Sequence, residues 1–119
     1  MSEFSSLVIM IMSGPDDGKT VLLSRESGDG LLDTDGTWSL VLGRREECDV
    51  SIPFDTQVSR RHALLRVSTS GELWLVDSGS LNGSFVDGKR IDEPTTITPG
   101  QLFRLGRTWM RVQPGGEGA

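Results

Sequence analysis

The chain of 119 residues is poor in cysteine and histidine, and each scarcity excludes a kind of protein. Its one cysteine, Cys48, cannot form a disulfide within the chain, and a lone thiol fits a reducing compartment. Its one histidine, His62, lacks the further ligands that a metal site needs. The acidic residues are scattered, and no pair of them suggests acid–base catalysis. We therefore expect no metal, no cofactor and no enzyme activity.

Long hydrophobic runs and an excess of positive charge are also missing. The apolar run Leu7–Met12 is too short for a signal peptide or for a membrane-spanning helix, which needs about 20 residues. We therefore expect a soluble, cytoplasmic chain without a membrane partner. The formal net charge of −5 argues against nucleic acid as a partner. A local basic cluster could still bind one phosphate, because salt screens charges beyond about 8–10 Å.

The sequence does contain many glycines, 15 in all, and a series of short apolar runs separated by turn residues. Runs of this length, about ten residues apart, favour an all-β sandwich or barrel. No stretch of a dozen residues shows a convincing helical period. The expected strands are Leu7–Met12, Thr20–Leu23, Trp38–Leu42, Val50–Ile52, His62–Val67, Leu73–Val76, Ser84–Val86, Thr95–Ile97, Leu102–Leu105 and Thr108–Val112.

Turn residues separate these runs. Asp87-Gly88 and Gly106-Arg107 each predict a two-residue hairpin, and Pro99-Gly100 predicts a turn before the next strand. The polar, Gly- and Asp-rich segment Ser24–Thr37 is expected to be a loop. We expect one domain over residues 1–112 and a flexible Gly-rich tail or linker over residues 113–119.

Polar residues gather at three expected strand ends: Leu42-Gly43-Arg44-Arg45, Ser59-Arg60-Arg61-His62 and Ser80-Leu81-Asn82-Gly83-Ser84. In a sandwich such turns cluster at the edges, so residues far apart in sequence can converge. Arginine offers a fork of donors that matches phosphate oxygens, and hydroxyls and loop amides add neutral donors. Three or four such bonds at about 1.5–3 kcal/mol each, less ordering costs, correspond to micromolar affinity.

The ordered set Gly43-Arg44, Ser59-Arg60-Arg61-His62 and Asn82-Gly83 resembles the signature of the forkhead-associated (FHA) domain, a phosphothreonine-binding family. The resemblance extends to Cys48–Ile52 and to Leu75–Gly88, and it covers nearly the whole chain. It implies an FHA/SMAD-type β-sandwich of about 11 strands in two sheets, with loops at one end that bind phosphothreonine.

The resemblance also implies roles for individual residues. Arg44 would clamp the phosphate, Ser59 would donate its hydroxyl, and Arg60 would add a second phosphate contact. Asn82 would hold the backbone of the bound peptide. The motif residues with an implied structural role are Gly43, His62 and Gly83.

Three further residues are expected to contact the peptide: Gln57, Val58 and Leu81. Leu81 departs from the family pattern, because many members carry threonine or serine there. Arg45 and Arg61, which follow the two implied phosphate ligands, are expected to be solvated surface residues.

The resemblance implies a module for phosphothreonine-dependent peptide or protein binding in signalling. Its partner would be a protein phosphorylated on threonine by a Ser/Thr kinase, or a phosphorylated segment of the same parent chain. The departure at Leu81 keeps an alternative open. In that alternative, the chain is an FHA-fold interaction or targeting domain that acts without phosphate, as part of a larger protein.

Overall fold

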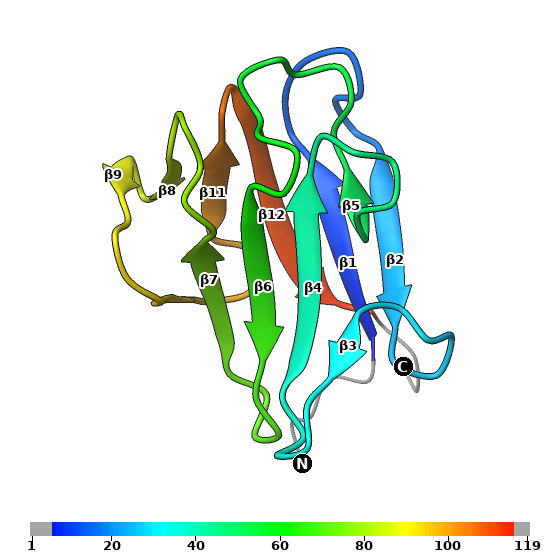
Figure 1. The fold of residues 1–119 in the computed structure, drawn as a ribbon. Helices are drawn as coiled ribbons and strands as arrows, with labels where there is room; N and C mark the ends of the chain where they lie inside the picture. The colour runs from blue at the N-terminus through cyan, green and yellow to red at the C-terminus, as the bar shows by residue number, and fades with distance from the viewer. Residues whose placement is uncertain (1–5, 116–119) are drawn as a thin grey trace.

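The computed structural model describes residues 6–115, which form two β-sheets packed face to face without any helix in that range (Figure 1). The strands are β1 (Ser6–Ile11), β2 (Thr20–Ser24), β3 (Leu31–Leu32), β4 (Trp38–Gly43), β5 (Val50–Ser51), β6 (Ala63–Val67), β7 (Leu73–Asp77), β8 (Ser84–Val86), β9 (Lys89–Arg90), β10 (Thr95–Ile97), β11 (Leu102–Leu105) and β12 (Thr108–Pro114).

Sheet A has the strand order β2-β1-β12-β11-β8-β9, and sheet B has the order β10-β7-β6-β4-β3. Strand β5 pairs with β4 in parallel, whereas the other pairs are antiparallel. Two separate sheets exclude the barrel and confirm the predicted sandwich. The described residues contain 12 strands where about 11 were expected.

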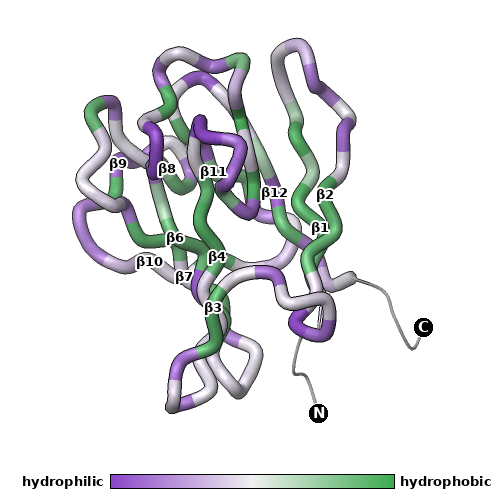
Figure 2. The backbone as a smooth tube through the Cα atoms, turned by 45° about the vertical axis from the view of Figure 1, so that its right-hand side comes forward, coloured by the Kyte–Doolittle hydropathy of each residue, from purple (hydrophilic) through white to green (hydrophobic). Residues whose placement is uncertain are grey.

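The core lies between the two sheets and follows the alternation of the strands. The buried hydrophobic side chains of β1 and β4, which belong to opposite sheets, are Leu7, Ile9, Ile11, Trp38, Leu40 and Leu42. Full burial of each aliphatic side chain contributes about 1.5–3 kcal/mol. The hydrophobic segments coincide with strands such as β1, β4 and β11, while the connecting loops are mostly neutral or hydrophilic (Figure 2). This core fixes the sheets on which the loops stand.

The predicted turns adopt the expected geometry. Asp87 and Gly88 have φ of 53° and 78° between the paired strands β8 and β9, as a two-residue hairpin turn of type I′ requires. Gly106, with φ of 56°, begins the hairpin between β11 and β12. Gly100 has φ of 88°, and the Gln101 N–H donates to the Thr98 carbonyl at 3.0 Å.

The segment Ser24–Thr37 is not entirely a loop, because it contains the short strand β3. Leu31 and Leu32 of β3 pair with Ser39 and Trp38 of β4. Both leucine side chains are exposed, at 70% and 62%. Main-chain hydrogen bonds to β4 therefore hold β3 in place. A strand held in this way shows no alternation of hydrophobic and polar residues, so the sequence does not reveal it.

The last strand also extends two residues beyond its predicted end at Val112. Gln113 and Pro114 of β12 pair with Val8 and Leu7 of β1. Their side chains are exposed, and main-chain pairing at this position needs no buried side chain. Residues 116–119 of the predicted tail lie outside the described residues, and the division into domain and tail stays a prediction.

The register of sheet B determines which loops meet. Leu42 pairs with Ala63, and Ala63 pairs with Asp77 on its other side. These three residues form one row across β4, β6 and β7 at the same end of the sandwich. The loops that follow β4, precede β6 and follow β7 therefore leave the sheet side by side, in the upper part of Figure 1.

Candidate functional site

The three polar motifs converge at this end of the sandwich. The main-chain N–H of Arg44 donates to the Ser59 carbonyl at 3.0 Å. The N–H of Leu81 donates to the Ser59 hydroxyl oxygen at 3.2 Å. Nδ2 of Asn82 donates to the Gln57 carbonyl at 2.9 Å. The predicted site residues of the three motifs therefore form one cluster.

Arg44 is exposed, but its side chain is held in place. Its Nε donates to the carbonyl of Val58 at 2.9 Å. Within residues 6–115, neither terminal guanidinium nitrogen has a hydrogen-bond partner. The guanidinium is thus oriented through Nε, and the two terminal nitrogens are free for an anion.

Ser59 connects two of the loops. Its hydroxyl oxygen accepts the Leu81 N–H, so the hydroxyl proton remains available to donate to a ligand. The Leu81 amide is already engaged by this bond. The Leu81 side chain is 84% exposed and makes an apolar projection beside the serine.

Asn82 is half-buried and has an internal partner. Its donation to the Gln57 carbonyl joins the loop after β7 to the loop before β6. In the described part of the chain its carboxamide oxygen Oδ1 has no hydrogen-bond partner, so that oxygen can accept from a peptide N–H.

His62 is completely buried beneath the loop before β6 and the loop after β7, and it hydrogen-bonds to both. Its Nδ1 accepts the Ser59 N–H at 2.9 Å, and its Nε2 faces the Gly83 carbonyl at 2.8 Å. Burial lowers the pKa of His62 below its ordinary value, although the Gly83 contact and the nearby Asp77 oppose this shift. The neutral imidazole therefore links the Ser59 loop to the Gly83 loop through two hydrogen bonds.

Two glycines permit the close approach of the loops. A Cβ added at Gly43 would collide with the carbonyl oxygen of Arg60. Gly83 has φ of +91°, and a Cβ there would lie 2.8 Å from Nε of Arg90. Both positions therefore require glycine, Gly43 for space and Gly83 mainly for its backbone conformation.

Arg60 and Val58 differ in what they offer a ligand. The Arg60 side chain is exposed, and no hydrogen bond or ion pair compensates its charge among residues 6–115. The Val58 side chain is only 1% exposed and packs in the core. The predicted peptide contact of Val58 is therefore wrong for its side chain, because the loop turns it inward. Gln57 is half-buried at the same loop.

Asp77, at the end of β7, is an organising residue that sequence reasoning missed. Its Oδ1 accepts the hydroxyls of Ser80 and Ser84, both at 2.6 Å, and its Oδ2 accepts the amides of Gly79 and Ser80 at 3.1 and 3.0 Å. Burial favours a raised pKa for Asp77, but the serine hydrogen bonds outweigh burial and the pKa is lowered. An aspartate before a Gly/Ser turn was the available signal.

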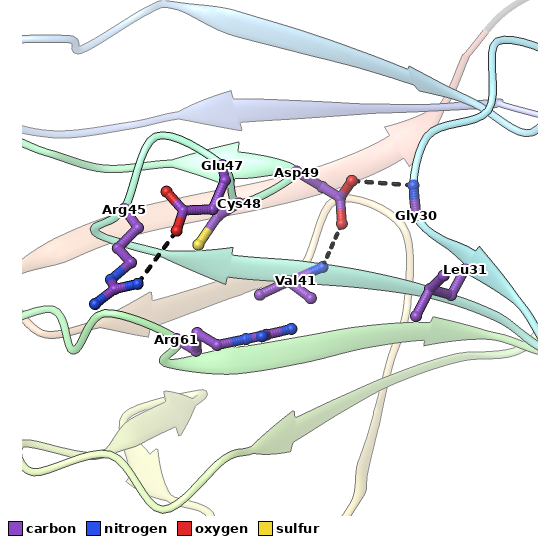
Figure 3. A pocket seen from close by; sticks show the side chains of 8 residues that line it. All are labelled: Gly30, Leu31, Val41, Arg45, Glu47, Cys48, Asp49 and Arg61. Atoms are coloured by element: carbon purple, nitrogen blue, oxygen red, sulfur yellow. Dashed lines mark hydrogen bonds and ion pairs between the residues drawn. The ribbon is translucent and has the colours of Figure 1, made fainter.

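A separate hollow of about 240 Å³ lies on the outer face of sheet B (Figure 3). It contains Arg45, paired with Glu47 at 3.3 Å, and Arg61, which has no ion-pair partner in the described range. Asp49 also lines it and accepts the amides of Gly30 and Val41. Its two arginines and two carboxylates balance, so the hollow offers no net positive charge to an anion. The lining residues are Gly30, Leu31, Val41, Arg45, Glu47, Cys48, Asp49 and Arg61.

The fold and the loop cluster define a β-sandwich domain whose three polar motifs stand on loops at one end. The sequence model of the FHA domain matches residues 40–106, which include all three motifs. The chain belongs to the FHA domain family. No helix in the described range is long and apolar enough to cross a membrane.

Two curated proteins resemble the chain at moderate identity. The glycogen accumulation regulator GarA of Mycolicibacterium smegmatis is 29% identical over 86% of this chain and 55% of its own length. The oxoglutarate dehydrogenase inhibitor of Corynebacterium glutamicum is 34% identical over 69% of this chain and 48% of its own length. The chain therefore spans about half the length of these two relatives.

Among solved structures, an FHA domain studied for phosphothreonine-dependent interactions superposes with a TM-score of 0.69 at 27% identity. The match covers 91% of this chain and 95% of that domain. The predicted fold class is thereby confirmed over nearly the full length of both domains.

Proposed function

We propose that the chain binds phosphothreonine-containing segments of proteins through the loops at this end of the sandwich. The observation that carries the proposal is the arrangement of Arg44. Its Nε is fixed by the Val58 carbonyl, its terminal nitrogens are free, and the Ser59 hydroxyl belongs to the same loop cluster.

The proposed chemistry follows from the charges. A phosphothreonine carries about −1.5 to −2 charges and three strong acceptor oxygens at neutral pH. Arg44 supplies a bidentate clamp, Ser59 a neutral donor, and Arg60 a second positive charge. Asn82 offers Oδ1 to the peptide backbone, and Gln57 and Leu81 border the path of the peptide. Binding of this kind needs no catalytic group, and we propose recognition without turnover.

The proposed partner is a protein phosphorylated on threonine by a Ser/Thr kinase, or a phosphorylated segment of the same parent chain. The similar FHA domain with phosphothreonine-dependent interactions supports this class of ligand. The preference for threonine over serine rests on the family membership.

A degenerate library of phosphothreonine peptides, screened by fluorescence anisotropy, tests the proposal. We expect micromolar binding, weakened by about tenfold or more for the phosphoserine and unphosphorylated versions of the same peptide. Arg44→Ala should abolish binding. Arg45→Ala is the matched control, because Arg45 is the adjacent exposed arginine and is paired with Glu47. Equal losses in the two variants would overturn the role of Arg44.

One observation favours a second function, recognition without phosphate. Leu81 exposes 84% of its side chain in the loop where many members of the family carry a hydroxyl residue. A peptide that binds equally well with and without its phosphate, and loses affinity in Leu81→Ala but not in Arg44→Ala, would establish this function instead.

A further inference from the structure

Asp55, in the loop between β5 and β6, is a buried carboxylate with three donors. Its Oδ1 accepts the Gln57 N–H at 2.9 Å. Its Oδ2 accepts the Arg107 N–H at 2.8 Å and the Thr108 hydroxyl at 2.6 Å. Only 6% of the residue is exposed. Asp55 thus ties a loop at the end of sheet B to the β11–β12 hairpin of sheet A.

The loop that Asp55 anchors accepts hydrogen bonds from two residues that we propose to bind the ligand, Asn82 and Arg44. The Gln57 carbonyl accepts Nδ2 of Asn82, and the Val58 carbonyl accepts Nε of Arg44. The Val58 N–H in turn donates to the carbonyl of Asp55 at 3.1 Å. Two consecutive carbonyl groups, both positioned from Asp55, therefore set the direction of one arginine and one asparagine.

The hairpin on the other side of Asp55 is packed tightly against this loop. A Cβ added at Gly106 would lie 2.9 Å from the carbonyl carbon of Gln57 and 3.0 Å from a methyl group of Val58. This close packing limits movement of the loop toward the hairpin, and the Asp55 hydrogen bonds oppose movement away from it. The position of both carbonyl groups is therefore determined by contacts across the two sheets.

The network requires a carboxylate. An ionised carboxylate only accepts hydrogen bonds, and both oxygens of Asp55 face donors. Burial favours a raised pKa for Asp55, but the hydrogen bonds from Thr108, Gln57 and Arg107 outweigh it, so the pKa lies below its ordinary value. An asparagine would direct its NH₂ group at a main-chain N–H in either amide orientation, and one donor would lose its acceptor.

We infer that Asp55 is a positioning residue of the phosphate site, which orients Arg44 and Asn82 through the carbonyl groups of Val58 and Gln57. The inference rests on the proposed function for its effect on affinity. The orientation of the Arg44 and Asn82 side chains by Asp55, however, is a property of the free protein and can be tested without ligand.

The test compares Asp55→Asn with Asp92→Asn. The control makes the same change of charge at an exposed residue whose side chain has no hydrogen bond or ion pair in the described part of the chain. In nitrogen-edited NMR spectra of the free protein, Asp55→Asn should shift the Arg44 Nε–H and Asn82 Nδ2 resonances and leave the core amides of Leu42 and Leu65 in place. Its affinity for the best phosphothreonine peptide should fall by about tenfold, as one lost anchoring bond predicts.

Thr108→Val provides a milder variant, because it removes one of the three donors and keeps both amides. It should shift the same two resonances by a smaller amount and weaken binding less than Asp55→Asn does. Unchanged Arg44 and Asn82 resonances in both variants would overturn the inference, as would affinities within about twofold of the Asp92→Asn control. If the unaltered protein binds no phosphothreonine peptide, the proposed function fails, and the NMR spectra alone decide the role of Asp55.

Discussion

The ring nitrogen Nδ1 of His62 accepts a hydrogen bond from the main-chain N–H of Ser59 at 2.9 Å. Because an amide N–H can only donate, Nδ1 must carry a lone pair and the ring proton must reside on Nε2. That proton is directed at the Gly83 carbonyl at 2.8 Å. A single neutral tautomer thus connects the two loops that carry Ser59 and Asn82, and a change at His62 has consequences for both.

Removal of the imidazole should destabilise the fold. His62→Ala leaves the part-buried Ser59 N–H and the buried Gly83 carbonyl without their imidazole partner, each loss costing about 1–3 kcal/mol. We expect the free energy of unfolding in urea to fall by about 3 kcal/mol. A loss below about 0.5 kcal/mol, the range of ordinary surface substitutions, would contradict the bracing role.

The stability should also depend on pH through this residue. The pKa of His62 is lowered in the folded state, so the unfolded chain takes up the proton first as the pH falls. The contribution of neutral His62 to the free energy of unfolding is fully present above about pH 6.5, the pKa of histidine in the unfolded chain. It is lost as the pH falls from there to the lower pKa of the folded state, with a slope of at most about 1.4 kcal/mol per pH unit.

His62→Gln supplies the control for this slope. His62 is the only histidine, and the pKa values of Asp55 and Asp77 are lowered, so these carboxyl groups titrate at lower pH. Urea unfolding between about pH 5 and pH 7 should show a slope in the unaltered protein and almost none in the variant. Equal slopes would assign the effect to other groups.

The two arginines of the Ser59–His62 motif should differ in binding. Arg60 is uncompensated at the loop cluster, whereas Arg61 lines the hollow on the outer face of sheet B (Figure 3). Arg60→Ala should weaken binding of a phosphothreonine peptide by about tenfold, as expected for one charge-assisted hydrogen bond. Arg61→Ala should stay within about twofold in the same anisotropy titration. The reverse order would place the second phosphate contact on Arg61.

Gly43 should not tolerate even one added methyl group. Gly43→Ala directs its Cβ at the Arg60 carbonyl oxygen, which is backbone and cannot turn aside. We expect a loss of about 2–3 kcal/mol in thermal or urea unfolding. Gly18→Asn is the comparison, because the space around Gly18 is open and only its φ of +92° would strain an added side chain. A cost at Gly43 no larger than at Gly18 would contradict the steric account.

Much of the fold could be predicted because its signals are local. The alternation of side chains between the two faces of β1 and β4 indicates which of them face the core. Asp87-Gly88 predicts a hairpin turn because both residues readily adopt a positive φ. Strand β3 could not be predicted, since its exposed leucines are held by pairing with β4. The inward turn of Val58 likewise depends on a core that other strands supply.

The site divides in the same way. The sequence by itself determined the residue types, with Arg44, Ser59 and Asn82 at strand ends, because motif and turn chemistry are local. Only the tertiary structure decided their orientation. Asp55 receives donors from residues more than fifty positions later, and the row of Leu42, Ala63 and Asp77 exists only once the strands have paired. Hydrogen bonds between distant segments depend on sheet register, and register is a property of the packed molecule.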